Sequence, residues 1–304
     1  MPPVALPDLS LAEWERTKDT LHLYLQIVGK VRLATASPRN HWWHVPLYVA
    51  IDGLTTGRLQ QGGVTFEIRF DVREHALRVE TADGRGESLA LRDGLTVAEF
   101  HARLLEILAG LGVHVELLDR PFGVPMTTPF SQDTEHASYD ADAVGRFWRA
   151  LDWIDGVFAE FAGWFCGKQS PVHLFWHSCD LAVTRFSGRE APPAPGADPV
   201  TREAYSHEVI SFGFWAGDQE VREPGFYSYT APEPDDLAGH ALQPPAAAWL
   251  EHRNGLLAFL PYEAVRTAAD PRRALLDFLQ SAYDAGSIAA GWDRAALRSS
   301  WSPR

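Results

Sequence analysis

The stretch HVPLYVAI (44–51) begins a series of runs that alternate in polarity or are rich in β-branched residues. It is followed by VTFEIRFDV (64–72), ALRVETADG (76–84) and ESLALRDG (87–94). Turn-forming residues, among them Gly62-Gly63 and Asp83-Gly84, separate these runs. Because side chains alternate between the two faces of a strand, the pattern predicts an antiparallel meander.

Helical patterns flank the predicted meander on both sides. Ser10 and Glu13 have the spacing of a capping box, and the apolar residues that follow recur at helical intervals up to Gly29. Thr96 and Glu99 have the same spacing before a second apolar series. The sequence therefore predicts helices over about 10–29 and 97–111.

The same order recurs in the second half, after a Pro-rich connection. An aromatic helical pattern runs from Asp140 to about Gly167, and a final helix is predicted to begin at Asp270-Pro271, where proline is tolerated. Between these helices, strand-like runs cover 172–186, 207–215, 225–230 and 256–261. Each half is therefore predicted to contain a helix, about four antiparallel strands and a helix.

Two segments share a pattern of Ser-Pro, four residues and Trp-His at identical spacing. They are SPRNHWWHVPLYVA (37–50) and SPVHLFWHSCDLAV (170–183). This similarity predicts an internal duplication in which Trp43-His44 superposes on Trp176-His177. The predicted fold class is α+β, with two duplicated two-layer units related by a pseudo-twofold axis.

The predicted organisation places the first α+β repeat at 1–118, a connecting loop at 119–139 and the second repeat, with Pro-rich insertions, at 140–304. We expect the two repeats to pack as one compact body. Ligands often bind where such units meet, so the cleft between the halves is the predicted ligand site.

The composition indicates a folded, acidic protein. Its 304 residues are 46% hydrophobic, and 40 Asp and Glu against 27 Lys and Arg give a formal net charge of −13. This charge argues against a general nucleic-acid or anionic-membrane partner. No run approaches the roughly 18 apolar residues of a membrane helix, and the amino-terminal residues lack a signal-peptide pattern. The two cysteines, Cys166 and Cys179, fit a reducing compartment, so we expect a soluble cytoplasmic protein.

Several common catalytic motifs do not occur in the sequence. They are GxSxG, the P-loop, the Rossmann glycine fingerprint and HExxH. The sequence therefore excludes the usual α/β-hydrolases, P-loop NTPases, Rossmann dehydrogenases and zincin proteases. It assigns no cofactor and no oligomeric state.

The richest polar stretch is HLFWHSCDLAVTRFSGR, residues 173–189. If it forms a single strand, His173, His177 and Cys179 share one face. His173 and His177 could then bind a metal ion together with His207. Alternatively, both histidines line a half-exposed sheet and Cys179 is a small buried apolar residue.

The end of this stretch offers a site for an anion. Arg185, Ser187 and Arg189 could clamp a carboxylate or a phosphate. The alternative is that Asp180 pairs with Arg185 inside the fold.

Two functional hypotheses follow, and the sequence leaves both open. The first is an enzyme that acts on a small polar or anionic metabolite in a cleft of the second repeat. Its predicted catalytic residues are His177, Asp180, His207 and Glu208, with His207 as the acid or base that Glu208 orients. The second is a non-catalytic module that binds a small molecule by stacking on Trp176, Trp215, Tyr227 and Tyr229. A metal-dependent enzyme is a narrower form of the first.

Several long segments together resemble one protein family. They are NHWWHVPLYVAIDGLTT (40–56), FWHSCDLAVTRFSGR (175–189), AYSHEVISFGFW (204–215), FYSYTAPEP (226–234) and LLDFLQSAYDAGSIAAGWD (275–293). The chain resembles an uncharacterised bacterial family catalogued only as a domain of unknown function. The resemblance covers nearly the whole chain and implies a full-length member, but it brings no activity, cofactor or catalytic residue with it.

Overall fold

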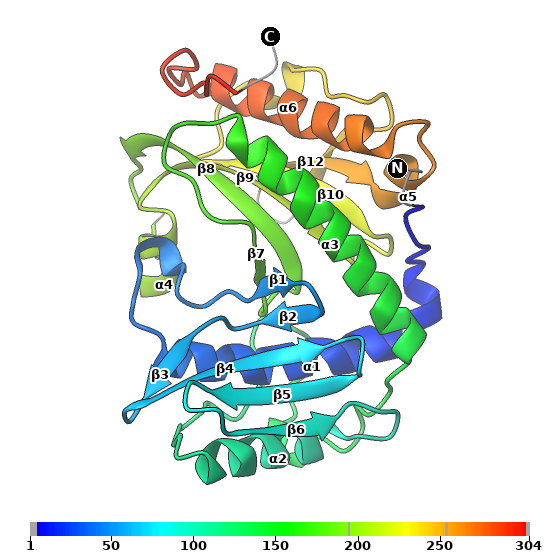
Figure 1. Ribbon diagram of the computed structural model, residues 1–304. Coiled ribbons are helices and arrows are strands. Elements are labelled where there is room, and N and C mark those ends of the chain that lie inside the picture. The colour runs from blue at the N-terminus through cyan, green and yellow to red at the C-terminus, as the bar shows by residue number, and fades with distance from the viewer. Residues whose placement is uncertain (1–4, 194, 253–254, 302–304) are drawn as a thin grey trace.

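The first half of the chain forms an antiparallel meander, as its alternating runs predict (Figure 1). The computed structural model describes residues 5–193, 195–252 and 255–301. The first sheet contains β1 (Tyr48–Ala50), β2 (Gly53–Thr55), β3 (Leu59–Gln61), β4 (Val64–Asp71), β5 (Ala76–Thr81) and β6 (Gly86–Ala90). The strand order is β1-β2-β4-β5-β6, and β3 also pairs with β4.

Two helices pack against the first sheet. In Figure 1, α1 (Leu11–Thr35) passes behind the strands and α2 (Val97–Gly110) lies below them. Thr96 caps α2 by accepting a hydrogen bond of 3.0 Å from the Glu99 N–H, as predicted. Tyr24 of α1 stacks on Phe100 of α2 with 4.0 Å between the ring centroids, so the two helices share one core.

The predicted ends of α1 need two corrections. The helix continues to Thr35 instead of ending near Gly29. A Cβ atom at Gly29 would lie 2.1 Å from Cγ of Trp176, so this glycine allows an indole to approach the helix backbone. At the other end, the Ser10 side chain makes no capping hydrogen bond, and the predicted capping box with Glu13 is wrong.

The polar side of α1 is buried as well as the apolar side. Nε2 of His22 donates to the carbonyl oxygen of Trp176 at 3.0 Å. The side-chain amide of Gln26 bonds to both the N–H and the carbonyl oxygen of Phe122, at 2.8 and 2.9 Å. Because every residue from Thr20 to Arg32 is buried, the middle of α1 is covered on all sides.

The second half forms another antiparallel sheet. It contains β7 (His173–Phe175), β8 (Asp180–Glu190), β9 (His207–Trp215), β10 (Gly225–Ala231), β11 (Ala248–His252) and β12 (Gly255–Pro261), in the order β11-β12-β10-β9-β8-β7. The helices α3 (Ala141–Gly163) and α6 (Pro271–Ala289) cross one of its faces (Figure 1). The connections contain α4 (Pro199–Ala204), α5 (Tyr262–Arg266) and the 3-10 turns η1 (Asn40–Trp42), η2 (Phe130–Gln132) and η3 (Leu237–Gly239).

The long helices of the second half begin where the sequence predicts. The Asp140 and Asp270 side chains cap α3 and α6 by accepting backbone N–H bonds of 3.0 and 2.9 Å. α3 ends at Gly163 rather than near Gly167. None of the helices in the described ranges combines the length and the apolar character that a membrane crossing requires.

Residues 172–186 form a hairpin instead of the predicted single strand. β7 ends at Phe175 and β8 begins at Asp180, and the register pairs these two residues. The residues between them form a turn in which Cys179 has a left-handed φ of 54°. The prediction that His177 and Cys179 share a strand face with His173 is therefore wrong, because both residues lie in the turn.

The two halves share the α+β class, but their duplication is not confirmed. Each sheet has six strands instead of about four. Trp43 directly follows the 3-10 turn η1, whereas Trp176 directly follows strand β7. The sheets meet where Leu47 and Leu174 exchange two backbone hydrogen bonds of 2.8 Å. The pseudo-twofold relation and the repeat boundaries remain predictions.

The aromatic stripe of α3 supplies a first test of the core. Leu151, Phe158 and Phe161 are buried, as the helical spacing predicts, and Trp148 is half-buried. We expect Phe158→Ala to lower the free energy of unfolding by about 3–5 kcal/mol, because it leaves a cavity in a packed core. Urea denaturation measures this loss. The exposed Asp152→Ala on the same helix is the control and should change stability by less than about 0.5 kcal/mol. A loss below about 1 kcal/mol for Phe158→Ala would contradict the packing.

Candidate functional site

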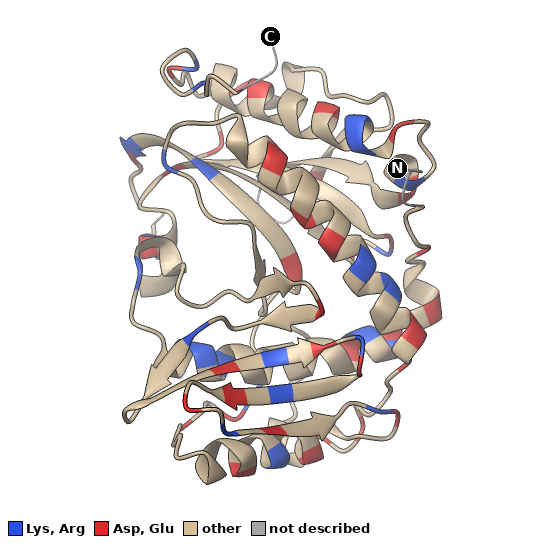
Figure 2. Cartoon of the chain, viewed as in Figure 1, with Lys and Arg blue, Asp and Glu red and all other residues tan. Residues whose placement is uncertain are grey.

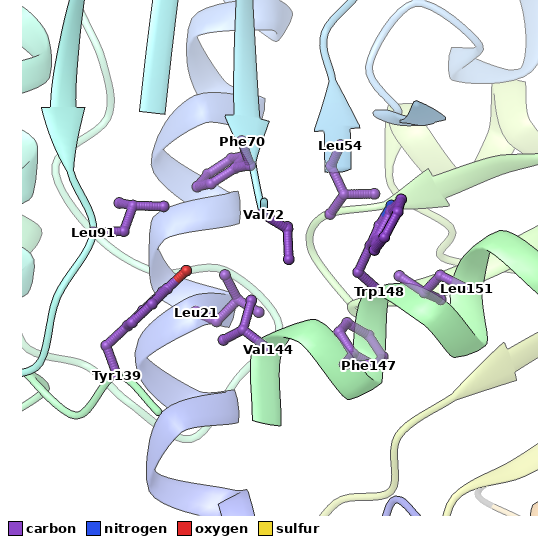
Figure 3. Close-up of a pocket in the computed structure, with 10 residues that line it drawn as sticks. All are labelled: Leu21, Leu54, Phe70, Val72, Leu91, Tyr139, Val144, Phe147, Trp148 and Leu151. Carbon is purple, nitrogen blue, oxygen red and sulfur yellow. The ribbon is translucent and has the colours of Figure 1, made fainter. Parts of the chain in front are cut away.

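The region between the halves, where a ligand cleft is predicted, contains a small apolar cavity (Figure 3). Side chains of α1, α3 and the first sheet line it, among them Leu21, Phe70, Val144 and Trp148. Its volume is about 10 Å³, which is close to the minimum for one water molecule. No predicted site residue lines this cavity, and it is too small for a metabolite.

Several predicted site residues gather instead on one face of the second sheet. The register pairs Asp180 with Trp215 and Gly213 with Tyr227, and directly paired residues point to the same face. The opposite face packs on the helices, as Phe212 does against α3. We call the face turned away from α3 and α6 the tyrosine face. It carries Asp180, Thr184, Ser211, Gly213, Trp215, Tyr227 and Tyr229.

Asp180 is the buried acid of the tyrosine face, with 6% of its surface exposed. One of its carboxylate oxygens accepts a hydrogen bond from the Ser178 hydroxyl, and the other accepts one from the Tyr227 hydroxyl. The described residues include no cation in an ion pair with Asp180. The nearby strands β10 and β12 carry no charged residue (Figure 2). The carboxylate is therefore held by hydroxyl groups and not by opposite charge.

Gly213 allows Tyr227 to reach this carboxylate. Tyr227 is on β10 and Asp180 is on β8, so the phenol ring must cross the intervening strand β9. A Cβ atom at Gly213 would lie 2.3 Å from the hydroxyl oxygen of Tyr227. A glycine at this position on β9 is what leaves space for the ring.

More hydroxyl groups continue from Tyr227 along the tyrosine face. The Tyr229 hydroxyl lies 2.9 Å from that of Tyr205, which is 38% exposed. This pair meets the Asp180 group through the contact between the Tyr227 and Tyr229 rings, whose centroids lie 6.2 Å apart. Burial raises the pKa of Tyr227 and of Tyr229 well above 10, so both phenols stay protonated at neutral pH and can donate. We call Ser178, Asp180, Tyr205, Tyr227 and Tyr229 the hydroxyl network.

Trp215 forms an aromatic wall beside the hydroxyl network. Its ring centroid lies 5.4 Å from that of Tyr227 and 5.8 Å from that of Phe259. Its indole Nε1 is buried and has no hydrogen-bond partner among the described residues. A ligand oxygen in this place would give that donor an acceptor.

Comparison with known proteins places the whole of this site inside one family. A family model described as a family of unknown function (DUF5996) matches residues 6–299 of the 304-residue chain. The chain belongs to the DUF5996 family. All the segments that carry the resemblance noted above lie within the match. Neither the curated proteins nor the solved structures include a significant match to the chain.

Arg185 does not reach the tyrosine face of this DUF5996 chain. It is five residues from Asp180 on β8, so strand alternation places it on the opposite face, where it is 2% exposed. Its guanidinium carbon lies 3.5 Å from the ring centroid of Phe161, and it donates to the Phe161 carbonyl oxygen at 2.5 Å. Both the predicted anion clamp and the alternative Asp180–Arg185 pair are therefore wrong.

The other two members of the predicted clamp lie at the far end of β8. Arg189 pairs with Glu208 at 2.7 Å and also donates to the carbonyl oxygen of Ala290. The Ser187 hydroxyl accepts the Arg189 backbone N–H at 3.0 Å. Because Glu208 is committed to Arg189, it does not orient His207 as predicted. Nδ1 of His207 lies 3.1 Å from the Ser206 hydroxyl instead.

The structure does not bring the predicted metal ligands together. His173 is fully buried on β7, and neither ring nitrogen has a hydrogen-bond partner among the described residues. His177 lies in the turn against Phe122, whereas His207 lies against His41. In the described ranges, no group of three or more His, Cys, Asp or Glu side chains is arranged to hold a metal ion.

Trp176 is also a structural residue rather than a wall of the tyrosine face. It packs on Gly29 and donates its indole N–H to the Val45 carbonyl oxygen at 3.0 Å, which ties the two halves together. Conversely, Ser178, Tyr205 and Gly213 belong to the site but are not among the predicted residues. The glycine inside the β9 sequence is a signal that could have indicated the close approach of another side chain.

Proposed function

We propose that the protein is an enzyme that acts on a small polar metabolite at the tyrosine face. Asp180 would accept a hydrogen bond or a proton from a hydroxyl or amine group of the substrate. The Tyr227 hydroxyl would keep the Asp180 carboxylate in position through its hydrogen bond. The protonated phenol of Tyr229 would donate to an oxygen atom of the substrate, and Trp215 would pack on its apolar surface.

The observation that carries this proposal is the environment of the Asp180 carboxylate. It is buried, it is bonded to two hydroxyls, and it has no cationic partner among the described residues. Burying a charge without a counter-ion costs several kcal/mol, on the order of the stability of a whole domain. Such an arrangement is typical of residues that serve a function, because an uncharged residue would stabilise the fold better.

A non-catalytic binding module is the second candidate function. It is favoured by the parallel rings of Tyr227 and Tyr229, which lie 6.2 Å apart with an angle of 7° between their planes. Aromatic surfaces of this kind hold planar or sugar-like ligands by stacking, without any chemical step. Both candidates use the same face and differ only in whether the bound molecule is converted.

We also infer a cytoplasmic location. The supporting observation is that Cys166 and Cys179 are both free, which suits a reducing compartment. The bacterial origin expected here rests on the family resemblance of the sequence.

Asp180→Asn and Tyr227→Phe test the site with minimal change of shape. A thermal-shift screen of small hydroxyl- and amine-bearing metabolites identifies ligands of the wild-type protein. We expect each variant to weaken binding of such a ligand by about tenfold to a hundredfold, because each loses a charge-assisted hydrogen bond. NMR spectra of the incubated ligand then distinguish an enzyme, which converts it, from a binding module, which does not.

Tyr24→Phe is the matched control for these variants. The Tyr24 hydroxyl is buried in the first half and donates to the Leu95 carbonyl oxygen at 2.5 Å, so this variant also loses one buried hydrogen bond. It should bind the ligand as the wild type does. If Asp180→Asn and Tyr227→Phe bind every ligand as tightly as Tyr24→Phe, the tyrosine face is not the site.

A further inference from the structure

Lysine is rare in this chain. The sequence contains three lysines, Lys18, Lys30 and Lys168, among its 27 Lys and Arg residues. Arginine serves wherever a permanent cation is sufficient, whereas a lysine in a suitable environment can lose its proton near neutral pH and act as a nucleophile. The three lysines are therefore the positions at which amine chemistry is to be sought.

Two of these lysines have surroundings that leave the amine without a base. Nζ of Lys18 pairs with the Asp19 carboxylate at 3.3 Å, which favours the charged form. Lys30 is 6% exposed and lies over the ring of Trp176, and it has no hydrogen-bond partner among the described residues. Neither amine has a neighbouring histidine nitrogen that could take up its proton near neutral pH.

Lys168 differs because its Nζ lies 2.6 Å from Nε2 of His41. The other ring nitrogen of His41, Nδ1, lies 3.2 Å from the carbonyl oxygen of Ala204. A carbonyl oxygen can only accept, so Nδ1 carries the proton of the neutral ring. The lone pair of Nε2 therefore accepts the hydrogen bond from Lys168.

The fold holds His41 in this position against a conformational preference. His41 and Trp42 have φ angles of 56° and 60°, in the left-handed region that residues with side chains seldom adopt. The His41 N–H donates to the Glu203 carboxylate at 2.8 Å, and its ring packs on Phe186 at 4.5 Å. Consecutive left-handed residues of this kind are found preferentially at functional sites.

Aromatic rings form the walls around the Lys168 amine. Nζ lies 5.5 Å from the ring centroid of Trp43 and 5.2 Å from that of Phe186. Burial lowers the pKa of Lys168 and of His41, although the nearby Glu203 carboxylate acts in the opposite direction on both. Lys168 is nevertheless exposed, so a small molecule can approach the amine.

We propose that Lys168 forms a Schiff base with a small aldehyde or ketone and that His41 relays the proton. Nε2 of His41 takes a proton from the ammonium, and the free amine attacks the carbonyl carbon to give a carbinolamine. The C–O bond then breaks as His41 returns its proton, and water leaves. The balance is one ammonium and one carbonyl compound to one protonated imine and one water.

This site does not depend on the hydroxyl network. Phe186 is six residues from Asp180 along β8, which corresponds to roughly 20 Å. The separation applies to Asp180, because Tyr205 of the hydroxyl network directly follows Ala204, whose carbonyl oxygen bonds to His41. A failure to find a ligand for Asp180 would leave the Lys168 proposal standing, and the reverse also holds.

Reductive labelling of the intact protein tests the proposal, with propanal as the carbonyl probe and cyanoborohydride as the reductant of the imine. Peptide mapping by mass spectrometry gives the labelling rate of each of the three lysines and separates them from the amino terminus. We expect Lys168 to be labelled at least about tenfold faster than Lys18 and Lys30 at neutral pH, because only Lys168 has a histidine nitrogen in place to take up its proton.

His41→Gln should lower the Lys168 rate by about tenfold or more, because it removes the proton acceptor. His207→Gln is the matched control, since the His207 ring touches His41 edge-on at 5.5 Å but makes no hydrogen bond to Lys168. It should leave the rate nearly unchanged. Equal labelling of the three lysines in the wild-type protein overturns the proposal, even if His41→Gln fails to fold. An unchanged Lys168 rate in a folded His41→Gln variant overturns it as well.

Discussion

Lowering the pH below about 6.5 is expected to destabilise the protein through two buried histidines. Burial lowers the pKa of His22 to about 4 and that of His173 to about 3, from an ordinary value of 6.5. Between these values the unfolded chain binds a proton at each histidine and the folded protein does not. The pair should therefore remove about 2.7 kcal/mol of unfolding free energy per pH unit between about pH 6 and pH 4.5, and nothing above about pH 7.

Single variants separate the contribution of the two histidines to the pH dependence of stability from that of other titrating side chains. Asp155, whose pKa burial raises to about 6, acts in the opposite direction on the same pH range. Urea denaturation at several pH values measures how the free energy of unfolding changes with pH. His22→Gln and His173→Leu should each reduce this change by about 1.4 kcal/mol per pH unit. The exposed His114→Gln should leave it unchanged. If all three variants have the wild-type pH dependence, His22 and His173 are not the buried neutral groups described above.

Arg185→Ala is expected to lower the free energy of unfolding by about 3 kcal/mol, because it empties a space between aromatic rings. The guanidinium carbon lies 3.5 Å from the ring centroid of Phe161 and 4.6 Å from that of Tyr283. Burial also lowers the pKa of Arg185 to about 9, which means that the charged form is less stable here than in water. The volume of the Arg185 side chain therefore stabilises the fold, whereas its buried charge destabilises it.

Arg185→Met separates the two effects. Methionine fills most of the space without a charge, so this variant should lose less than about 1.5 kcal/mol in chemical denaturation. It should also bind any ligand of the tyrosine face as tightly as the wild type. If Arg185→Met binds less tightly while remaining folded, Arg185 contributes to the site in spite of its place on the opposite face.

Local patterns were sufficient to predict most of the elements. The capping residues Thr96, Asp140 and Asp270 mark three helix starts correctly, because a cap depends on residues within one turn. The α+β class follows from period-two runs between these helices. The end of α1 is wrong because Gly29 is normally a stop signal, and the indole that makes it a packing site comes from the other half of the chain.

The site was predicted only in part. Asp180, Trp215, Tyr227 and Tyr229 were identified from the polar and aromatic character of their strands, and the structure brings these four together. His177 was assigned to the wrong element because no local signal places the turn between β7 and β8. The anion-binding role predicted for Arg185 is wrong because a strand sequence shows alternation without showing which side is covered by helices.

The sequence by itself determined the acidic character of the chain and its α+β class, since these depend on composition and on short-range periodicity. Only the tertiary structure decided that Tyr227 crosses Gly213 to reach Asp180 and that His41 meets Lys168. These pairs are 47 and 127 residues apart in the chain. Their contacts arise from strand order and loop packing, which no periodic pattern within one segment can specify.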